Sequence, residues 1–242
     1  MSSVVTNRDA VIVETPSVGY FGKYPGYPDF VQNALPASLV GVWRDWTAEF
    51  MAAGTSEFGD EWLEIYLHSP VWRFCLFDDD FVGTEDGGWA GAVMPSLDSR
   101  GRYFPMLVAA PVPPAPSLAL LRGSQPFFDQ LEARLIRCLS EPTLDHTKLP
   151  EHFVTELPSL KLSQPVGTSM HASLEDDAAA LSVLDDVLAR HRCRISWWQA
   201  ANVASGEGRL HAYPGQPVAT EFAAVQGSTV SIVKEQEEDV SA

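Results

Sequence analysis

Three apolar segments joined by short, turn-forming connections constrain the fold of this chain more than any other feature. The segments cover residues 71–77, 88–94 and 103–110, and each has the length and residue types of a β-strand. The connections contain Asp78-Asp-Asp80, Glu85-Asp-Gly-Gly88 and Asp98-Ser-Arg-Gly-Arg102, which are typical of turns. A parallel crossover needs about a dozen residues or more, usually as a helix. The three segments therefore predict an antiparallel meander.

Apolar residues at helical spacing predict two helices before these strands and one directly after them. The first covers 39–53, with Ser38 as its N-cap and Gly54 as its end, and the second covers 57–67. A first strand is expected at 18–24, before a turn at Pro25-Gly-Tyr-Pro28. The third helix covers 125–140, begins at the N-cap Ser124 and lies on the sheet through Phe128, Leu131, Leu135, Ile136 and Leu139.

The last hundred residues are less regular, and the same criteria predict a helix at 173–188, a strand at 192–198 and a short helix at 218–225. The predicted fold class is therefore α/β (α+β), with a mainly antiparallel central sheet covered by helices. Large aromatic residues in these elements are expected in the core, among them Phe21, Phe30, Trp72, Trp89 and Phe104.

The charge of the chain excludes several classes of partner. It carries 32 acidic against 16 basic residues, a net charge of −16, which repels nucleic acid and anionic membranes. No stretch approaches the roughly 18 apolar residues of a membrane span, and the N-terminus lacks the pattern of a signal peptide. Cys75, Cys138 and Cys193 are widely spaced among apolar residues, which is typical of buried free thiols. We therefore expect a cytoplasmic protein without direct membrane insertion.

The common catalytic and metal-binding motifs are missing. The sequence has no Gly-x-Ser-x-Gly elbow, no His-Glu-x-x-His motif and no Cys-x-x-Cys pair. The cluster Asp78-Asp-Asp80 resembles the opening of a calcium loop, but Trp89 stands where the bidentate Glu is needed. We therefore expect no metal, no cofactor and no enzymatic activity. A hydrolase or phosphatase that uses Ser96 and Asp98 with a histidine brought close by the fold remains the alternative.

Two segments are more particular than a generic fold requires. They are Gly19-Tyr-Phe-Gly-Lys-Tyr-Pro-Gly-Tyr-Pro-Asp-Phe30 and Trp89-Ala-Gly-Ala-Val-Met-Pro-Ser-Leu-Asp-Ser-Arg-Gly-Arg-Tyr-Phe-Pro105, and Pro70-Val-Trp-Arg-Phe74 lies between them. In this order they resemble the TagF (ImpM) family of type VI secretion accessory proteins. One departure is Pro28, which stands where the family usually has glycine, and proline restricts φ at this turn.

The resemblance implies a single TagF-like domain at 16–233, with its core motifs in 18–140 and a more divergent part at 141–233. Residues 1–15 are expected to form a flexible tail and 234–242 an acidic tail. Whether residues after 140 form a separate lobe stays open.

The resemblance also implies a function. It implies a bacterial, cytoplasmic, non-enzymatic regulator that represses assembly of the type VI secretion system post-translationally by binding the forkhead-associated scaffold protein. A structural subunit of the apparatus is a further possibility. The sequence does not indicate the oligomeric state.

The candidate partner-binding residues are Lys23, Asp29, Ser96, Asp98, Arg100, Arg102 and Trp198. The charged residues among them admit two interpretations, internal salt bridges with turn hydrogen bonds, or a shared surface that a partner contacts. Trp197 and Trp198 are adjacent, so on a strand they face opposite sides of the sheet. The outward ring would serve as an interface anchor or lie beneath a covering helix.

Overall fold

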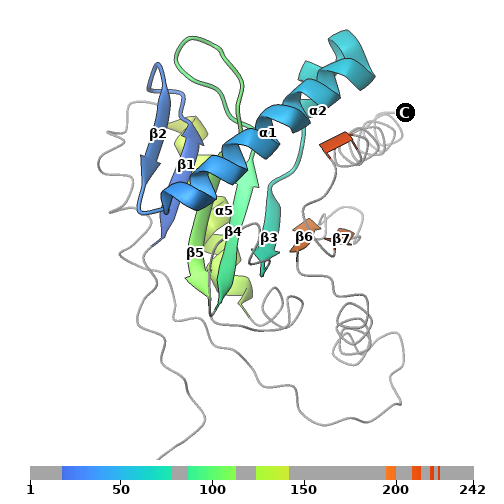
Figure 1. Cartoon of the computed structure of the whole chain (residues 1–242). Helices are drawn as coiled ribbons and strands as arrows, with labels where there is room; N and C mark the ends of the chain where they lie inside the picture. The colour runs from blue at the N-terminus through green and yellow to red at the C-terminus, as the bar shows by residue number, and fades with distance from the viewer. Residues whose placement is uncertain are drawn as a thin grey trace, which may run out of the picture.

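A central antiparallel sheet with helices on both faces forms the structure (Figure 1). This computed structural model describes residues 18–77, 87–112, 124–141, 195–199, 209–213, 219, 220 and 223. Its seven strands lie in the order β2-β1-β5-β4-β3-β6-β7. Their bounds are Gly19–Lys23 (β1), Phe30–Asn33 (β2), Trp72–Leu76 (β3), Gly88–Met94 (β4), Met106–Val112 (β5), Ile195–Gln199 (β6) and Arg209–Tyr213 (β7). The predicted fold class is confirmed.

The meander predicted from the three apolar segments is present as β3, β4 and β5. β4 pairs antiparallel with β3 on one side and with β5 on the other. β5 begins at Met106, three residues later than the prediction, because Tyr103 pairs with Leu97 inside the connecting loop. β1 joins the free edge of β5, and the chain then turns back to form β2, a strand that we did not predict. Its four residues are too few to show an alternating pattern.

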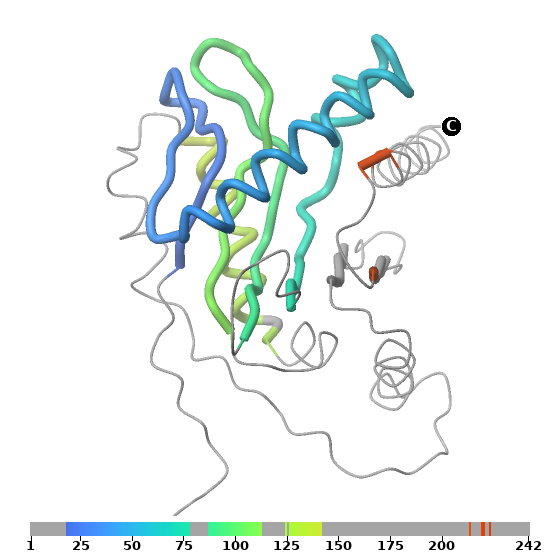
Figure 2. Tube along the Cα trace, in the orientation of Figure 1, coloured from blue at the N-terminus to red at the C-terminus, as the bar shows by residue number. Residues whose placement is uncertain are grey.

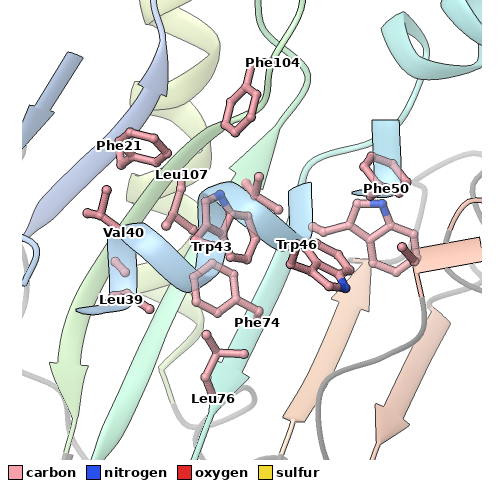
Figure 3. Packing of buried hydrophobic residues seen from close by; sticks show 14 of the residues in the cluster. Phe21, Leu39, Val40, Trp43, Trp46, Phe50, Phe74, Leu76, Phe104 and Leu107 are labelled. Atoms are coloured by element: carbon pink, nitrogen blue, oxygen red, sulfur yellow. The ribbon is translucent and has the colours of Figure 1, made fainter. Parts of the chain in front are cut away.

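Side chains alternate between two apolar layers along the meander, as the period of a strand requires. On β5, Leu107 and Ala109 face one layer, whereas Met106 and Val108 face the other. Helix α1 (Ala37–Phe58) covers the first layer through Trp43, Trp46 and Phe50, as Figure 3 shows. Helix α5 (Gln125–Ser140) lies on the second layer. The sheet is therefore buried on both faces.

Helix α1 starts and ends at residues other than those predicted. Its N-cap position is Pro36 and not Ser38, and no side chain caps its first turn. It continues through Gly54 to Phe58, and η1 (Gly59–Glu61) and α2 (Trp62–Leu67) follow. A Cβ at position 54 would lie 2.3 Å from the ring of Trp62. The glycine is therefore a packing residue that admits an indole against the helix, not a helix end.

Helix α5 has the predicted bounds, but its buried face is partly different. Phe128, Leu131 and Leu135 are buried as expected, whereas Ile136 and Leu139 are 52% and 40% exposed. Phe127 and Cys138 complete the buried stripe instead. The helix is thus rotated relative to the predicted face. Ser124 precedes the helix, but its side chain makes no capping hydrogen bond.

Arg73 joins β3 to α5 by two ion pairs at the edge of the second apolar layer. Its guanidinium Nε lies 2.5 Å from Glu132 Oε1, and Nη2 lies 2.7 Å from Asp129 Oδ1. The guanidinium also lies 5.6 Å from the centre of the Phe128 ring. Burial lowers the pKa of Arg73, but Glu132 and then Asp129 raise it by a larger amount. The cation therefore stays charged while its stem is buried.

Two strands after position 141, β6 and β7, add to the same sheet. β6 pairs with β3 and overlaps the strand predicted at 192–198, and β7, which we did not predict, pairs with β6. In the short helix predicted at 218–225, residues 219, 220 and 223 are helical, and Ala219 and Ala223 are buried against the α1 layer. The predicted helix at 173–188, both predicted tails and the Asp78-Asp-Asp80 turn lie outside the described residues.

None of the described helices combines the length and the hydropathy that a transmembrane span requires.

Candidate functional site

The two motif segments singled out in the sequence lie side by side in the structure. The β1–β2 turn (residues 24–29) stands next to the β4–β5 loop (residues 95–105), as Figures 1 and 2 show. The Ser99 amide donates a hydrogen bond to the Tyr27 carbonyl at 2.8 Å, and Arg102 Nη2 donates to the Pro28 carbonyl at 2.6 Å. These bonds join the two segments into one unit.

Asp98 is the centre of this unit. Its side chain is fully buried and accepts hydrogen bonds from Lys23 Nζ at 2.7 Å and from Arg102 Nε at 2.8 Å, both on Oδ2. The backbone amides of Arg100 and Arg102 donate to Oδ1, each at 3.0 Å. The turn also needs Gly101, whose φ of 75° lies in the left-handed region. We call Lys23, Ser96, Asp98 and Arg102 the Asp98 cluster.

The Asp98 cluster holds an ionised carboxylate. Burial by itself raises the pKa of Asp98, but Lys23, the amides of Arg102 and Arg100, and the Arg102 side chain lower the pKa below its usual range. An ionised carboxylate accepts hydrogen bonds and cannot donate a proton. Asp98 therefore has the chemistry of a structural anion and not that of a general acid.

Ser96 is also committed to internal bonds. Its hydroxyl is buried and donates to the Lys23 carbonyl at 2.7 Å. The Ser96 amide donates to the Tyr66 hydroxyl at 2.8 Å, and that hydroxyl donates to the Ser96 carbonyl at 2.9 Å. Burial raises the pKa of Tyr66, so the phenol stays neutral. Because the Ser96 proton points at a carbonyl, this geometry does not suit a nucleophile.

Phe30 lies at the edge of the cluster and was wrongly expected in the core. The residue is 40% exposed, although its ring stacks on Phe21 at 5.3 Å and meets Phe104 edge-on at 4.8 Å. The Lys23 ammonium lies 5.4 Å from the centre of the same ring. The ring is therefore held in place while the residue stays partly exposed.

The candidate residues separate into an interior and a surface group. Lys23, Ser96 and Asp98 are buried, which supports the interpretation as internal salt bridges and turn bonds. Asp29, Arg100 and Arg102 are exposed, and with Pro28 and Phe30 they form what we call the rim surface. Among the described residues, Arg100 forms no ion pair.

Trp198 is not part of this site. It lies on β6, where it pairs with Arg73 of β3 and Leu210 of β7. Three strands, β5, β4 and β3, separate β6 from β1. The predicted role of Trp198 as an interface anchor stays a prediction.

Sequence reasoning missed the roles of Phe30, the Pro28 carbonyl and Tyr66. Phe30 lies within the first motif and beside Asp29, so its place in the motif was the available signal. The Pro28 carbonyl and Tyr66 form hydrogen bonds with residues far along the chain, and such bonds cannot be predicted from a local sequence pattern.

Within the described ranges, no three His, Cys, Asp or Glu side chains are grouped to bind a metal ion. A small apolar pocket of about 30 Å³ lies between α1 and the ends of the sheet, and its walls include Trp46, Thr47, Pro70, Pro95 and Pro105. It has room for roughly two water molecules.

Comparisons with known proteins agree with the resemblance found in the sequence. The family model of the TagF N-terminal domain, described as type VI secretion system-associated, matches residues 19–153. The crystal structure of PA0076 from Pseudomonas aeruginosa PAO1 is similar to this chain with a TM-score of 0.65 and 32% sequence identity, over 86% of this chain and 92% of that chain. No curated protein matches the chain. The chain thus belongs to the TagF N-terminal domain family and is a type VI secretion system-associated protein.

Proposed function

We propose that this chain is a non-enzymatic, cytoplasmic repressor of type VI secretion that acts after translation by binding the forkhead-associated scaffold protein of the apparatus. Membership of the TagF N-terminal domain family supports the link to secretion. The observation that carries the proposal is the division of the candidate residues: the buried carboxylate and hydroxyl are used internally, and the arginines face outward.

A binding function uses this arrangement better than a catalytic one. A catalyst needs a group that changes its protonation or bonding during turnover. Asp98 is held ionised by four donors, and the Ser96 proton is donated to a backbone carbonyl. A binding surface needs side chains that are held in position and exposed, which describes Phe30 and Arg102. The hydrolase alternative would require Ser96 to leave the Lys23 carbonyl.

The first test is a titration of the full chain with the scaffold protein from the same secretion system, followed by calorimetry. We expect a saturable complex. In cells, overproduction of the chain should stop secretion, and its deletion should raise secretion where the apparatus is otherwise held inactive. Failure to form the complex, together with secretion that neither change affects, would reject the proposal.

A Ser96→Ala variant separates binding from catalysis. It removes the only hydroxyl of the proposed dyad, and it should bind the scaffold and repress secretion at full strength under conditions where circular dichroism shows it folded. Loss of repression with unchanged binding and folding would instead favour the hydrolase alternative.

A further inference from the structure

We propose that the rim surface is a docking site for an acidic segment of a protein partner, with Arg100 and Arg102 pairing its carboxylates and Phe30 packing against an apolar side chain. This inference builds on the proposed function, because it names the surface and the chemistry by which that partner would be held. Three features of the rim surface carry it.

The first feature is that Arg102 is already positioned. Its Nε is bonded to Asp98 and its Nη2 to the Pro28 carbonyl, yet 53% of the side chain is exposed. Nη1 makes no hydrogen bond to any other described residue and is available to a ligand. A free arginine loses side-chain entropy on binding, and an arginine that is held in advance loses less. Arg102 therefore presents a fixed donor for a carboxylate.

The second feature is the local charge. Arg100 is exposed, its amide is fixed on Asp98, and its guanidinium has no ion-pair partner in the described part of the chain. The rim surface and the buried Lys23–Asp98 pair beneath it contain three cations, Lys23, Arg100 and Arg102, and two anions, Asp29 and Asp98. Their local charge is therefore +1 on a chain of −16. The chain as a whole repels an acidic segment, whereas the rim surface attracts it. This local attraction determines where the segment binds.

The third feature is the aromatic ring beside the arginines. Phe30 is fixed by Phe21 and Phe104 and keeps 40% of its surface exposed. Aromatic and arginine side chains together are the usual composition of the energetic centre of a protein interface. An apolar neighbour of the partner's carboxylates would cover the ring. A nucleic acid fits less well, because its continuous charge would meet the acidic remainder of the surface.

The test compares two charge reversals on the full chain. Arg100→Glu changes the rim surface at a side chain with no ion pair among the described residues, so the substitution should not destabilise the fold. Arg44→Glu is the matched control, because Arg44 is also exposed on α1, its ion-pair partner among the described residues is its neighbour Asp45, and the substitution produces the same change in net charge. Each protein is titrated with the scaffold protein, and separately with a fluorescein-labelled peptide of alternating Glu and Leu residues.

We expect Arg100→Glu to weaken both complexes by about tenfold or more, and Arg44→Glu to leave both nearly unchanged. If the scaffold protein binds and the two variants behave alike, the rim surface is not the docking site, although the proposed function stands. If the scaffold protein does not bind at all, this scaffold is not the partner, and the titration with the peptide alone tests the rim surface. The inference is overturned if Arg100→Glu does not weaken binding of the peptide. It is also overturned if a single-stranded oligonucleotide binds as tightly as the peptide.

Discussion

The Lys23 ammonium and the Asp98 carboxylate form a buried ion pair of 2.7 Å between residues that are 75 positions apart. Lys23 ends β1, and Asp98 lies in the β4–β5 loop. The pair therefore joins the two segments that identify the family, and it holds the backbone on which Arg100 and Arg102 stand. Variants of the pair test whether the site is built in this way.

Removing the two members of this pair should have unequal effects. In Lys23→Met, Asp98 keeps Arg102 and two backbone amides, so we expect a loss of about 1–3 kcal/mol in the free energy of unfolding. In Asp98→Asn, the Lys23 ammonium stays buried without a carboxylate, and the loss should be larger. Urea unfolding of both variants measures this order. A Lys23→Met variant less stable than Asp98→Asn would contradict it.

The Asp98 carboxyl should also make stability depend on acid pH. Its pKa is lowered in the folded chain, whereas the unfolded chain binds the proton near the ordinary value of about 3.9. The stabilisation is complete above that ordinary value and is lost as the pH falls through the folded pKa. The difference in unfolding free energy between wild type and Asp98→Asn should therefore shrink between about pH 7 and about pH 3. A difference that stays constant over this range would show that Asp98 is not ionised in the folded chain.

Two glycines of α1 should respond in opposite directions to alanine. A Cβ at Gly41 meets nothing within 4 Å, so Gly41→Ala should stabilise the chain by about 0.5–1 kcal/mol through helix propensity. A Cβ at Gly54 would lie 2.3 Å from the Trp62 ring, so Gly54→Ala should destabilise the chain by about 1–3 kcal/mol. Thermal unfolding of the two variants provides the comparison. Stabilisation by both would mean that the Trp62 ring does not pack there.

The two carboxylates that pair with Arg73 should contribute unequally to the free energy of unfolding. The Asp129 side chain is 64% exposed and the Glu132 side chain 21%, so water screens the first pair more than the second. Asp129→Asn should cost about 0.5 kcal/mol or less, and Glu132→Gln about 1–2 kcal/mol. Equal losses in chemical denaturation would contradict the difference in burial.

The two described cysteines should be unreactive while the chain is folded. Burial raises the pKa of Cys75 far above its ordinary value and that of Cys138 to about 12. Near pH 8 both thiols are then protonated and shielded, so iodoacetamide should label them slowly in buffer and rapidly in urea. Peptide mass mapping reads each site separately. Rapid labelling of Cys75 in buffer would show that β3 opens locally.

The prediction of the sheet succeeded where the pattern was local. The three strands of the meander were predictable because apolar residues and turn clusters lie within each segment. β2 and β7 were missed, and each is a strand that pairs with one that was predicted, β1 or β6. Ile136 and Leu139 were placed wrongly, because an apolar residue beside the buried stripe looks the same in sequence as one within it.

The sequence by itself determined the antiparallel meander, the helix at 125–140 and membership of the family, because each rests on the identity and spacing of nearby residues. Only the tertiary structure decided which motif residues are interior and which form the rim surface. Exposure depends on what distant segments place against a side chain, and here the β4–β5 loop buries Lys23 while it leaves Arg100 outside. For the same reason, Gly54, which we expected to end the helix, is a position where the Trp62 indole packs against the helix.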